Sequence, residues 1–425
     1  MILNRKIQPD FKLIDKVNII KAEKVNLDNQ IPVYYINAGS QDLVKIDFIF
    51  EAGTWNQKKK LIASTTNNML LEGTKTQTSL QIAEKLDYYG SYLQNDSGKH
   101  YGTLTLFILN KYLDEGLEIV EDLLQNPIFP EKDLSTLMLN RLQEFVINSQ
   151  KNDKLARSYY NEMIFGNAHP YGIRYCEDDF KNVAREDLIE FFENYYNLNN
   201  CTIIISGKVE DKHFKSLNNF FGKKNYKKSI KQLDNNFFIQ PFKEKIKYEE
   251  RTDAFQTAIR IGKPTINMKH PDFNALQVVN TILGGYFGSR LMKNIREEKG
   301  YTYGIGSGLS TMKESGYFVV VTEVKKEVKD AALNEIYKEI EILQNEKVTD
   351  DELNVVKNYM MGDILRGFDG AFSLSGVFRN LWEYNLDYDY ITNMINIVKN
   401  ITSDEIQRLA NVYLQRNSMY EVAVG

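Results

Sequence analysis

Side chains able to bind a metal or act as nucleophiles are few and widely spaced in this sequence of 425 residues. The four histidines are His100, His169, His213 and His270. No two of them are three to five residues apart, so the sequence holds no local histidine pair of the kind that binds zinc. The two cysteines, Cys176 and Cys201, belong to no C-x-x-C motif, which excludes a disulfide scaffold and a structural zinc site of cysteines.

One pair of residues could stabilise a developing negative charge. Arg296 and Tyr303 lie seven residues apart, across a turn that is expected to join the end of a helix to a strand. A phenol hydroxyl is a good donor to an oxyanion, and a guanidinium offers a fork of donors to carbonyl oxygens. Residue types alone favour a structural interpretation instead, with Arg296 paired to Glu297 or Glu298 and Tyr303 packed on the sheet.

The elements that carry such residues belong to an internal repeat. Residues 185–207 and 403–425 each read as a helix with an acidic start, followed by a short strand that ends in glycine. With an offset of 218 residues, Tyr195 aligns with Tyr413. An offset near half the chain length indicates duplication of a domain of about 200 residues.

Hydrophobic periodicity predicts strands and helices in both halves. Strands are expected at 44–53, 101–109, 256–262 and 316–323, and helices at 79–89, 113–124, 131–149, 329–344 and 350–365. This order predicts the α+β class, with two homologous domains that each place helices on one face of an antiparallel sheet. We expect an N-terminal domain at 1–214, a solvated linker at 215–236 and a C-terminal domain at 237–425. The linker segment is rich in Lys and Asn, and a basic binding patch is its alternative interpretation.

Composition and charge exclude several classes of protein. Hydrophobic residues make up 43% and charged residues 26%, which is typical of a globular protein rather than a disordered one. The net charge of −4 gives no electrostatic basis for binding nucleic acid or an anionic membrane. No signal peptide or membrane-spanning stretch is recognisable. We therefore expect a cytoplasmic protein, or a periplasmic one if a signal has been removed.

Residues 62–74, IASTTNNMLLEGT, contain a polar run that residue types alone place in a turn, because Ser, Thr and Asn compete for backbone hydrogen bonds. The segment nevertheless resembles the zinc-binding helix of the pitrilysin/insulinase zinc peptidases, or inverzincins, whose H-x-x-E-H pattern precedes apolar residues and Gly-Thr. The resemblance places Ser64, Asn67 and Asn68 at the His, Glu and His positions. It places the family's third ligand at Glu144.

These replacements remove the chemistry of the motif. In the family, two imidazoles and a carboxylate hold zinc, and the helical glutamate takes a proton from the attacking water. Ser64 and Asn68 are weak neutral ligands and Asn67 cannot act as a base, so we expect no metal and no other cofactor in this chain. Glu144 is then expected to be a helix-surface residue or part of a salt bridge.

The resemblance covers nearly the whole chain. Residues 165–172 are similar to a segment of the family's first domain, and residues 280–304 match its glycine turn and its Arg…Tyr pair. The resemblance implies a fold like that of the mitochondrial processing peptidases, in which each chain forms half of a clamshell. It also implies that Arg296 and Tyr303 face a zinc site across a closed chamber.

A lost metal motif beside a retained Arg…Tyr pair resembles the zinc-lacking subunit of bacterial heterodimeric processing-peptidase-like enzymes. This implies a chain that is not an enzyme on its own and that supplies Arg296 and Tyr303 in trans, as catalytic residues, to a zinc-bearing homologous subunit that cleaves peptides. A peptide-binding or structural scaffold with no peptidase role is the main alternative. An active homodimer using another metal would need ligands that positions 64, 67 and 68 do not supply.

Overall fold

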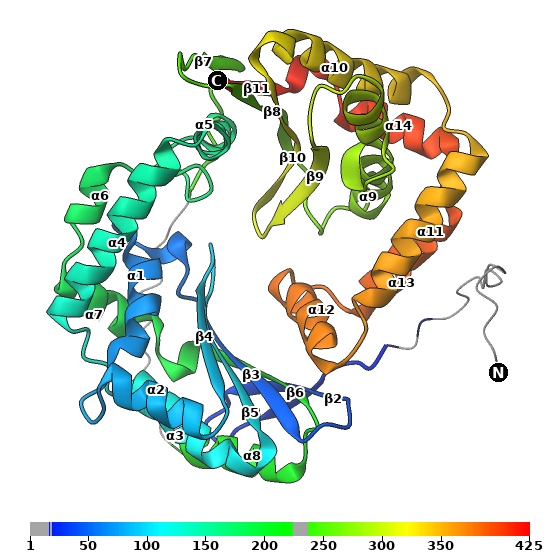
Figure 1. Ribbon diagram of the computed structural model, residues 1–425. Helices are drawn as coiled ribbons and strands as arrows, with labels where there is room; N and C mark the ends of the chain where they lie inside the picture. The colour runs from blue at the N-terminus through cyan, green and yellow to red at the C-terminus, as the bar shows by residue number, and fades with distance from the viewer. Residues whose placement is uncertain (1–16, 18, 224–236) are drawn as a thin grey trace, which may run out of the picture.

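The computed structural model describes residue 17, residues 19–223 and residues 237–425, and these form two β-sheets, one in each half of the sequence (Figure 1). The first sheet has the strand order β1-β2-β6-β3-β5-β4 and comprises β1 Glu23–Asn26, β2 Pro32–Asn37, β3 Leu43–Phe50, β4 Tyr92–Ser97, β5 Gly102–Leu109 and β6 Cys201–Gly207. The second has the order β7-β11-β8-β10-β9 and comprises β7 Ile246–Glu249, β8 Gln256–Thr265, β9 Ile305–Met312, β10 Ser315–Lys325 and β11 Tyr420–Val424. The predicted α+β class with two like units is confirmed.

Apart from β1, an additional edge strand of the first sheet, the two sheets share one topology, and both are antiparallel except for a single pair of strands. Strands β2 and β6 run parallel in the first sheet, and β7 and β11 run parallel at the corresponding place in the second. In each pair, the second strand, β6 or β11, is the one that follows the helix of the internal repeat. The parallel pair is a feature that alternation of residues along single strands could not indicate, because a strand buried on both faces looks alike in either direction.

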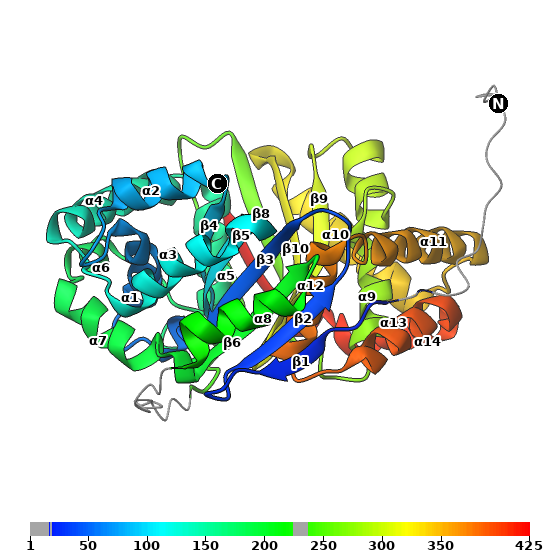
Figure 2. The ribbon, with the colours of Figure 1, turned by 90° about the horizontal axis from the view of Figure 1, so that it is seen from below.

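Helices fill the sequence between the strands. In the first half they are α1 Ile62–Met69, α2 Ser79–Tyr88, α3 Leu113–Gln125, α4 Glu131–Ser149, α5 Asn152–Phe165, α6 Glu177–Lys181, α7 Arg185–Tyr195 and α8 Asp211–Leu217. In the second half they are α9 Phe273–Asn280, α10 Lys329–Asn345, α11 Asp350–Arg366, α12 Ala371–Glu383, α13 Tyr388–Asn400 and α14 Ser403–Tyr413. Seen from below, α1, α3 and α7 gather on one side of the molecule and α9, α13 and α14 on the other (Figure 2). None of the helices that the structure describes is long and apolar enough to cross a membrane.

The internal repeat is confirmed in the structure. Tyr195 is the last residue of α7 and Tyr413 is the last residue of α14, and a central strand follows each helix after a short turn. Strand β6, with the sequence CTIIISG, shows why this strand is central. Its β-branched residues are buried on both faces, with Ile203 and Ile205 in the helix-covered core and Ile204 on the opposite face.

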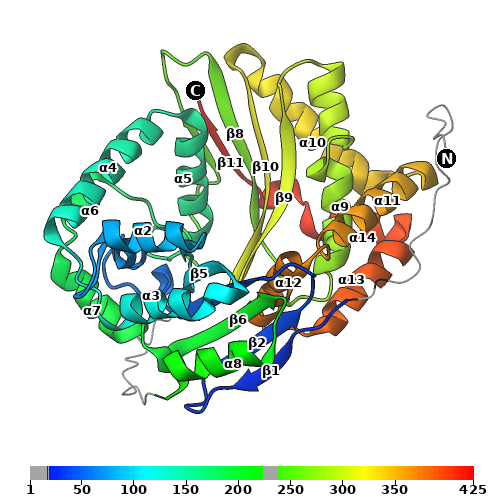
Figure 3. The ribbon, with the colours of Figure 1, turned by 60° about the horizontal axis from the view of Figure 1, so that its bottom comes forward.

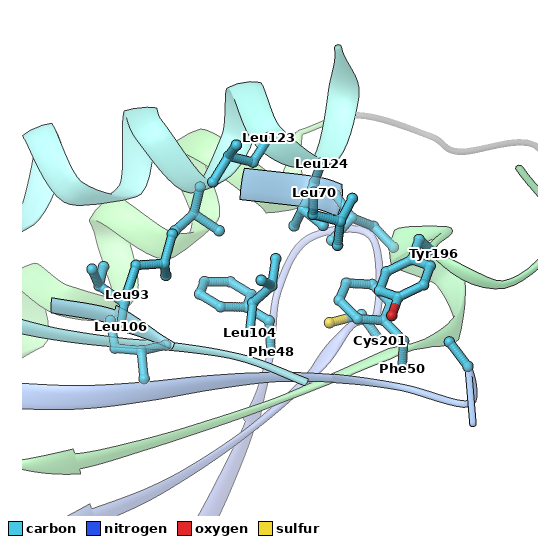
Figure 4. Close-up of a cluster of buried hydrophobic side chains, with 14 of the residues drawn as sticks. Phe48, Phe50, Leu70, Leu93, Leu104, Leu106, Leu123, Leu124, Tyr196 and Cys201 are labelled. Carbon is cyan, nitrogen blue, oxygen red and sulfur yellow. The ribbon is translucent and has the colours of Figure 1, made fainter. Parts of the chain in front are cut away.

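The first core lies between the sheet and the helices on one of its faces (Figure 4). Phe48 and Leu104 project from β3 and β5 and meet Leu123 and Leu124 of α3. The second half builds a separate core in the same way, from strands β8 and β10 and helices α9, α10 and α14. Each half therefore has a core of its own.

The two halves exchange one helix across their inner faces (Figures 1 and 3). Helix α5 of the first half packs on β8 and β11 of the second sheet, where the Tyr160 hydroxyl donates to the Phe318 carbonyl at 2.7 Å. Helix α12 of the second half packs on the first sheet, where Leu374 and Phe378 cover Ile36 and Ile204. Each sheet thus has its own helices on one face, as predicted, and one helix from the other half on the other.

The segment expected as a linker, 215–236, begins inside helical structure. Helix α8 continues into a π-helical turn, Asn218–Gly222, and Leu217 and Phe221 are buried in the first core. Residues 224–236 lie outside the described residues. The boundaries at 214 and 237 therefore stay a prediction.

Candidate functional site

The degenerate motif lies on a helix, as the resemblance implies and against the turn that residue types alone suggest. Helix α1, Ile62–Met69, places Ser64 and Asn68 one turn apart. Two of its polar side chains have tertiary partners: Thr65 accepts a hydrogen bond from Arg141, and Asn67 donates to Tyr196. Because these side chains bond to other parts of the fold, they do not unwind the helix.

The hydroxyl of Ser64 is hydrogen-bonded to an arginine. Nη2 of Arg141, on α4, donates to Ser64 Oγ at 2.9 Å, and Nη1 donates to Thr65 Oγ1 at 2.8 Å. The Ser64 hydroxyl in turn donates to the Leu61 carbonyl at 3.1 Å. Burial lowers the pKa of Arg141, while Tyr175 and Glu144 act to raise it. The guanidinium remains charged, because arginine does not lose its proton in proteins.

Asn67, at the position of the general base, is fully buried. Its Nδ2 donates to the Tyr196 hydroxyl at 2.9 Å and to the Thr103 carbonyl at 3.4 Å. Its Oδ1 atom is buried without a hydrogen-bond partner. The side chain therefore ties α1 to the end of the first core and has no path to a substrate.

Asn68 and Glu144 both face away from the core. Asn68 is exposed on α1, and Glu144 is exposed on α4, where it accepts a hydrogen bond from Asn148 at 3.4 Å. Among the described residues, no three or more His, Cys, Asp and Glu side chains are grouped so that they could hold a metal. A hydroxyl, an amide and one carboxylate, with a guanidinium bonded to the hydroxyl, do not fit zinc, which takes imidazole, thiolate and carboxylate ligands.

Arg296 and Tyr303 do come together, through the backbone of Tyr303. Arg296 lies in the π-helical segment Met292–Glu298, and its Nε donates to the Tyr303 carbonyl at 3.0 Å. Its guanidinium lies over the Phe287 ring, 4.7 Å from the centroid, and forms a 3.7 Å ion pair with Glu297. The Tyr303 side chain is 94% exposed. The structural interpretation is therefore right for the pairing of Arg296 with Glu297 and wrong for Tyr303, which does not pack on the sheet.

A cavity of about 310 Å³ opens beside Tyr303 on the inner face of the second sheet. Arg260 of β8, Glu323 of β10 and Asp153 of α5 are among its lining residues. Burial, and secondarily the charge of Asp153, raises the pKa of Glu323. Burial also lowers the pKa of Arg260. The cavity therefore presents charges of both signs beside an exposed phenol.

The turn that carries Tyr303 is fastened to the sheet by its neighbour Thr302. The Thr302 hydroxyl contacts the Glu323 carbonyl at 2.6 Å and accepts from the Gly304 amide at 3.1 Å. Thr322 adds a hydrogen bond to Thr302 at 3.1 Å. The backbone on both sides of Tyr303 is thus held, while its side chain is free to contact another molecule.

Sequence reasoning missed the charged residues of this cavity and also missed Arg141. Arg260 and Glu323 interrupt the apolar strands QTAIRIG and FVVVTEV, and a charge inside such a strand is a signal that could have marked the inner face. Arg141 lies three residues before Glu144, on the same side of one helix. In the described part of the chain, no hydrogen bond or ion pair joins the degenerate motif to the Arg296 and Tyr303 pair, which lies in the other half.

Comparisons with known proteins match both halves. A family model described as insulinase (peptidase family M16) matches residues 33–170, and one described as peptidase M16 inactive domain matches residues 182–360. An uncharacterized zinc protease of Rickettsia felis is 26% identical over 399 residues, which is 91% of this chain and 93% of that protein. A Helicobacter pylori protein named non-peptidase homolog YmxG is 24% identical over 403 residues, covering 92% of this chain and 90% of its own. A peptidase M16 inactive domain structure from Pseudomonas fluorescens superposes with a TM-score of 0.82 at 23% identity, over 95% of this chain and 98% of its own, and so has the same fold.

Proposed function

The chain belongs to the insulinase family of peptidases, family M16, and on that basis we propose that it is a non-catalytic subunit that pairs with a zinc-bearing homologue. In this proposal the chain supplies Arg296 and Tyr303 to the partner's site, where peptides are cleaved. The chain carries no zinc, and the metal belongs to the partner. Its expected cytoplasmic location, without nucleic-acid or membrane partners, stays a prediction.

The observation that carries this proposal is the exposed phenol of Tyr303 on a fixed backbone. Arg296 and Thr302 hold the turn, yet 94% of the Tyr303 side chain is open to solvent. Burial of this aromatic ring would stabilise the fold, yet the turn holds the ring out in solvent. A fixed backbone with a free hydroxyl is what a donor to a second molecule needs.

The residues of this chain would act by hydrogen bonding and positioning. When a peptide carbonyl is attacked at the partner's metal site, its oxygen gains negative charge, and the Tyr303 hydroxyl would donate to that oxygen. Arg296 would act mainly by holding the Tyr303 carbonyl, which fixes the backbone that carries the ring. The cavity lined by Arg260, Asp153 and Glu323 would accept peptide groups next to the cleaved bond.

A peptide-binding scaffold is the second candidate, and the same cavity favours it. Charges of both signs beside an exposed aromatic ring can bind an extended peptide without any metal nearby. The Helicobacter pylori relative is named a non-peptidase homolog, which is compatible with either function. The two candidates differ in whether hydrolysis by a partner depends on this chain.

The test is reconstitution with a homologue from the same organism that has an intact H-x-x-E-H motif. Peptidase activity is measured with a mixture of quenched fluorescent peptides for each chain alone and for an equimolar mixture. We expect a 1:1 complex on size-exclusion chromatography and activity that rises at least about 100-fold on mixing, as for an added oxyanion donor.

The control is the same partner with the glutamate of its own motif changed to glutamine, which should abolish activity in the mixture. Full activity of the partner alone, unchanged by this chain, would exclude the subunit role. Peptide binding by the isolated chain, measured by fluorescence anisotropy, would then support the scaffold.

A further inference from the structure

We propose that the guanidinium of Arg141 replaces a metal cation between α1 and α4 and keeps metals out of this position. The proposal does not depend on the pairing with a zinc-bearing subunit. It rests on what Arg141 contacts, and it explains why the degenerate motif still forms a well-packed helix.

The guanidinium of Arg141 lies between α4 and α1. Nη2 bonds to Ser64, which stands at the position of the first histidine, and Arg141 lies one helical turn from Glu144, which stands at the position of the third ligand. Nη1 bonds to Thr65 on the next position of α1. The cation therefore joins the same two helices that two histidines and a glutamate would join through a metal.

The positive charge of Arg141 is permanent. The guanidinium sits against Ser64 and Thr65, and Tyr175 and Glu144 lie close enough to favour its charged form. A histidine or lysine in this place could become neutral on burial, but an arginine cannot. A dication approaching Ser64 would meet a fixed positive charge at hydrogen-bond distance from its ligand atom. Repulsion between charges about 4 Å apart remains large even at an effective dielectric constant near 20.

A consequence follows for any attempt to restore the site. Changing Ser64 and Asn68 to histidine supplies both imidazoles, yet the guanidinium of Arg141, which contacts the residue at position 64, would remain on α4, one helical turn from Glu144. The two histidines alone should therefore bind zinc poorly. Removal of Arg141 in the same background should open the site.

The experiment measures zinc binding by isothermal titration calorimetry in the background S64H/N68H. Three forms are compared: the background alone, the background with R141M, and the background with K132M. Met keeps an unbranched side chain of similar length. Lys132 is an exposed cation on the same helix, so K132M removes the same charge away from the site and is a matched control.

We expect R141M to tighten zinc binding by at least about 100-fold over the background, and K132M to leave it within about threefold. Equally tight binding by the background and the R141M form would overturn the proposal. A second measurement decides the case in which none of the three binds zinc. In the natural sequence, methylguanidinium at millimolar concentration should restore part of the melting temperature lost by R141A and none of that lost by K132A. No rescue of R141A would overturn the proposal.

Discussion

Replacing Tyr303 with phenylalanine separates a role in catalysis from a role in the fold. The hydroxyl makes no hydrogen bond within the described part of the chain, and 94% of the side chain is exposed. Its removal should therefore change the free energy of unfolding by less than about 0.5 kcal/mol. If the hydroxyl donates to an oxyanion at the partner's site, its loss should lower kcat of the complex by about 10²-fold, which corresponds to about 2.7 kcal/mol.

The assay is steady-state kinetics of the reconstituted pair, with a thermal melt of each variant. Tyr88→Phe is the matched control, because Tyr88 is also exposed, at 80%, but lies on α2 far along the chain. Arg296→Ala should lower kcat as well, because Tyr303 loses the bond that fixes its carbonyl, and should raise KM if the guanidinium also grips the peptide. Wild-type rates with Tyr303→Phe, in a complex that assembles normally, would refute the reasoning and leave the scaffold as the better function.

Three further predictions concern the fold. Burial and nearby lysine charges lower the pKa of both His100 and His169 from 6.5 to about 4, so stability should be complete above pH 6.5 and fall as the pH drops toward 4, by up to about 1.4 kcal/mol per pH unit for each histidine. Urea unfolding at several pH values measures this slope, and a flat profile would contradict it. Asn67→Glu should cost at least about 2 kcal/mol in urea unfolding, because it buries a carboxylate, whereas Asn67→Gln should cost less. Tyr160→Phe should cost about 1–2 kcal/mol by the same assay, because it removes the buried hydrogen bond to Phe318, and an unchanged midpoint would show that this bond between the halves contributes nothing.

Much of the fold followed from local pattern and from the repeat. The helix at 131–149 was predicted with its observed ends, because Pro130 precedes it and its apolar residues recur at helical spacing. The exchange of α5 and α12 could not be predicted in this way. Each is an ordinary amphipathic helix in sequence, and only the tertiary fold decides which sheet it covers.

The residues of the candidate site also differ in whether their contacts are local in sequence. The Arg296 and Tyr303 pair was visible because its residues are close in sequence. Arg141 was not, since its partners Ser64 and Thr65 lie on another helix and are brought near only by folding. The only signal of the cavity residue Arg260 is a charge inside an apolar strand. The resemblance places Asn67 in the motif, but its hydrogen bond to Tyr196, 129 residues away, has no local signal.

The repeat also explains how one half can lack metal ligands and keep its fold. Helix α9 follows β8 as α1 follows β3, and it packs into the second core without any metal-binding side chain. With the 218-residue offset, Arg141 of α4 corresponds to Tyr359 of α11, whose ring lies 4.8 Å from that of Tyr286. Tyr359 thus joins α11 to the segment that follows α9 through tilted rings, whereas Arg141 joins α4 to α1 through hydrogen bonds. Each contact joins its elements through protein side chains alone, so the packing of these helices does not require zinc.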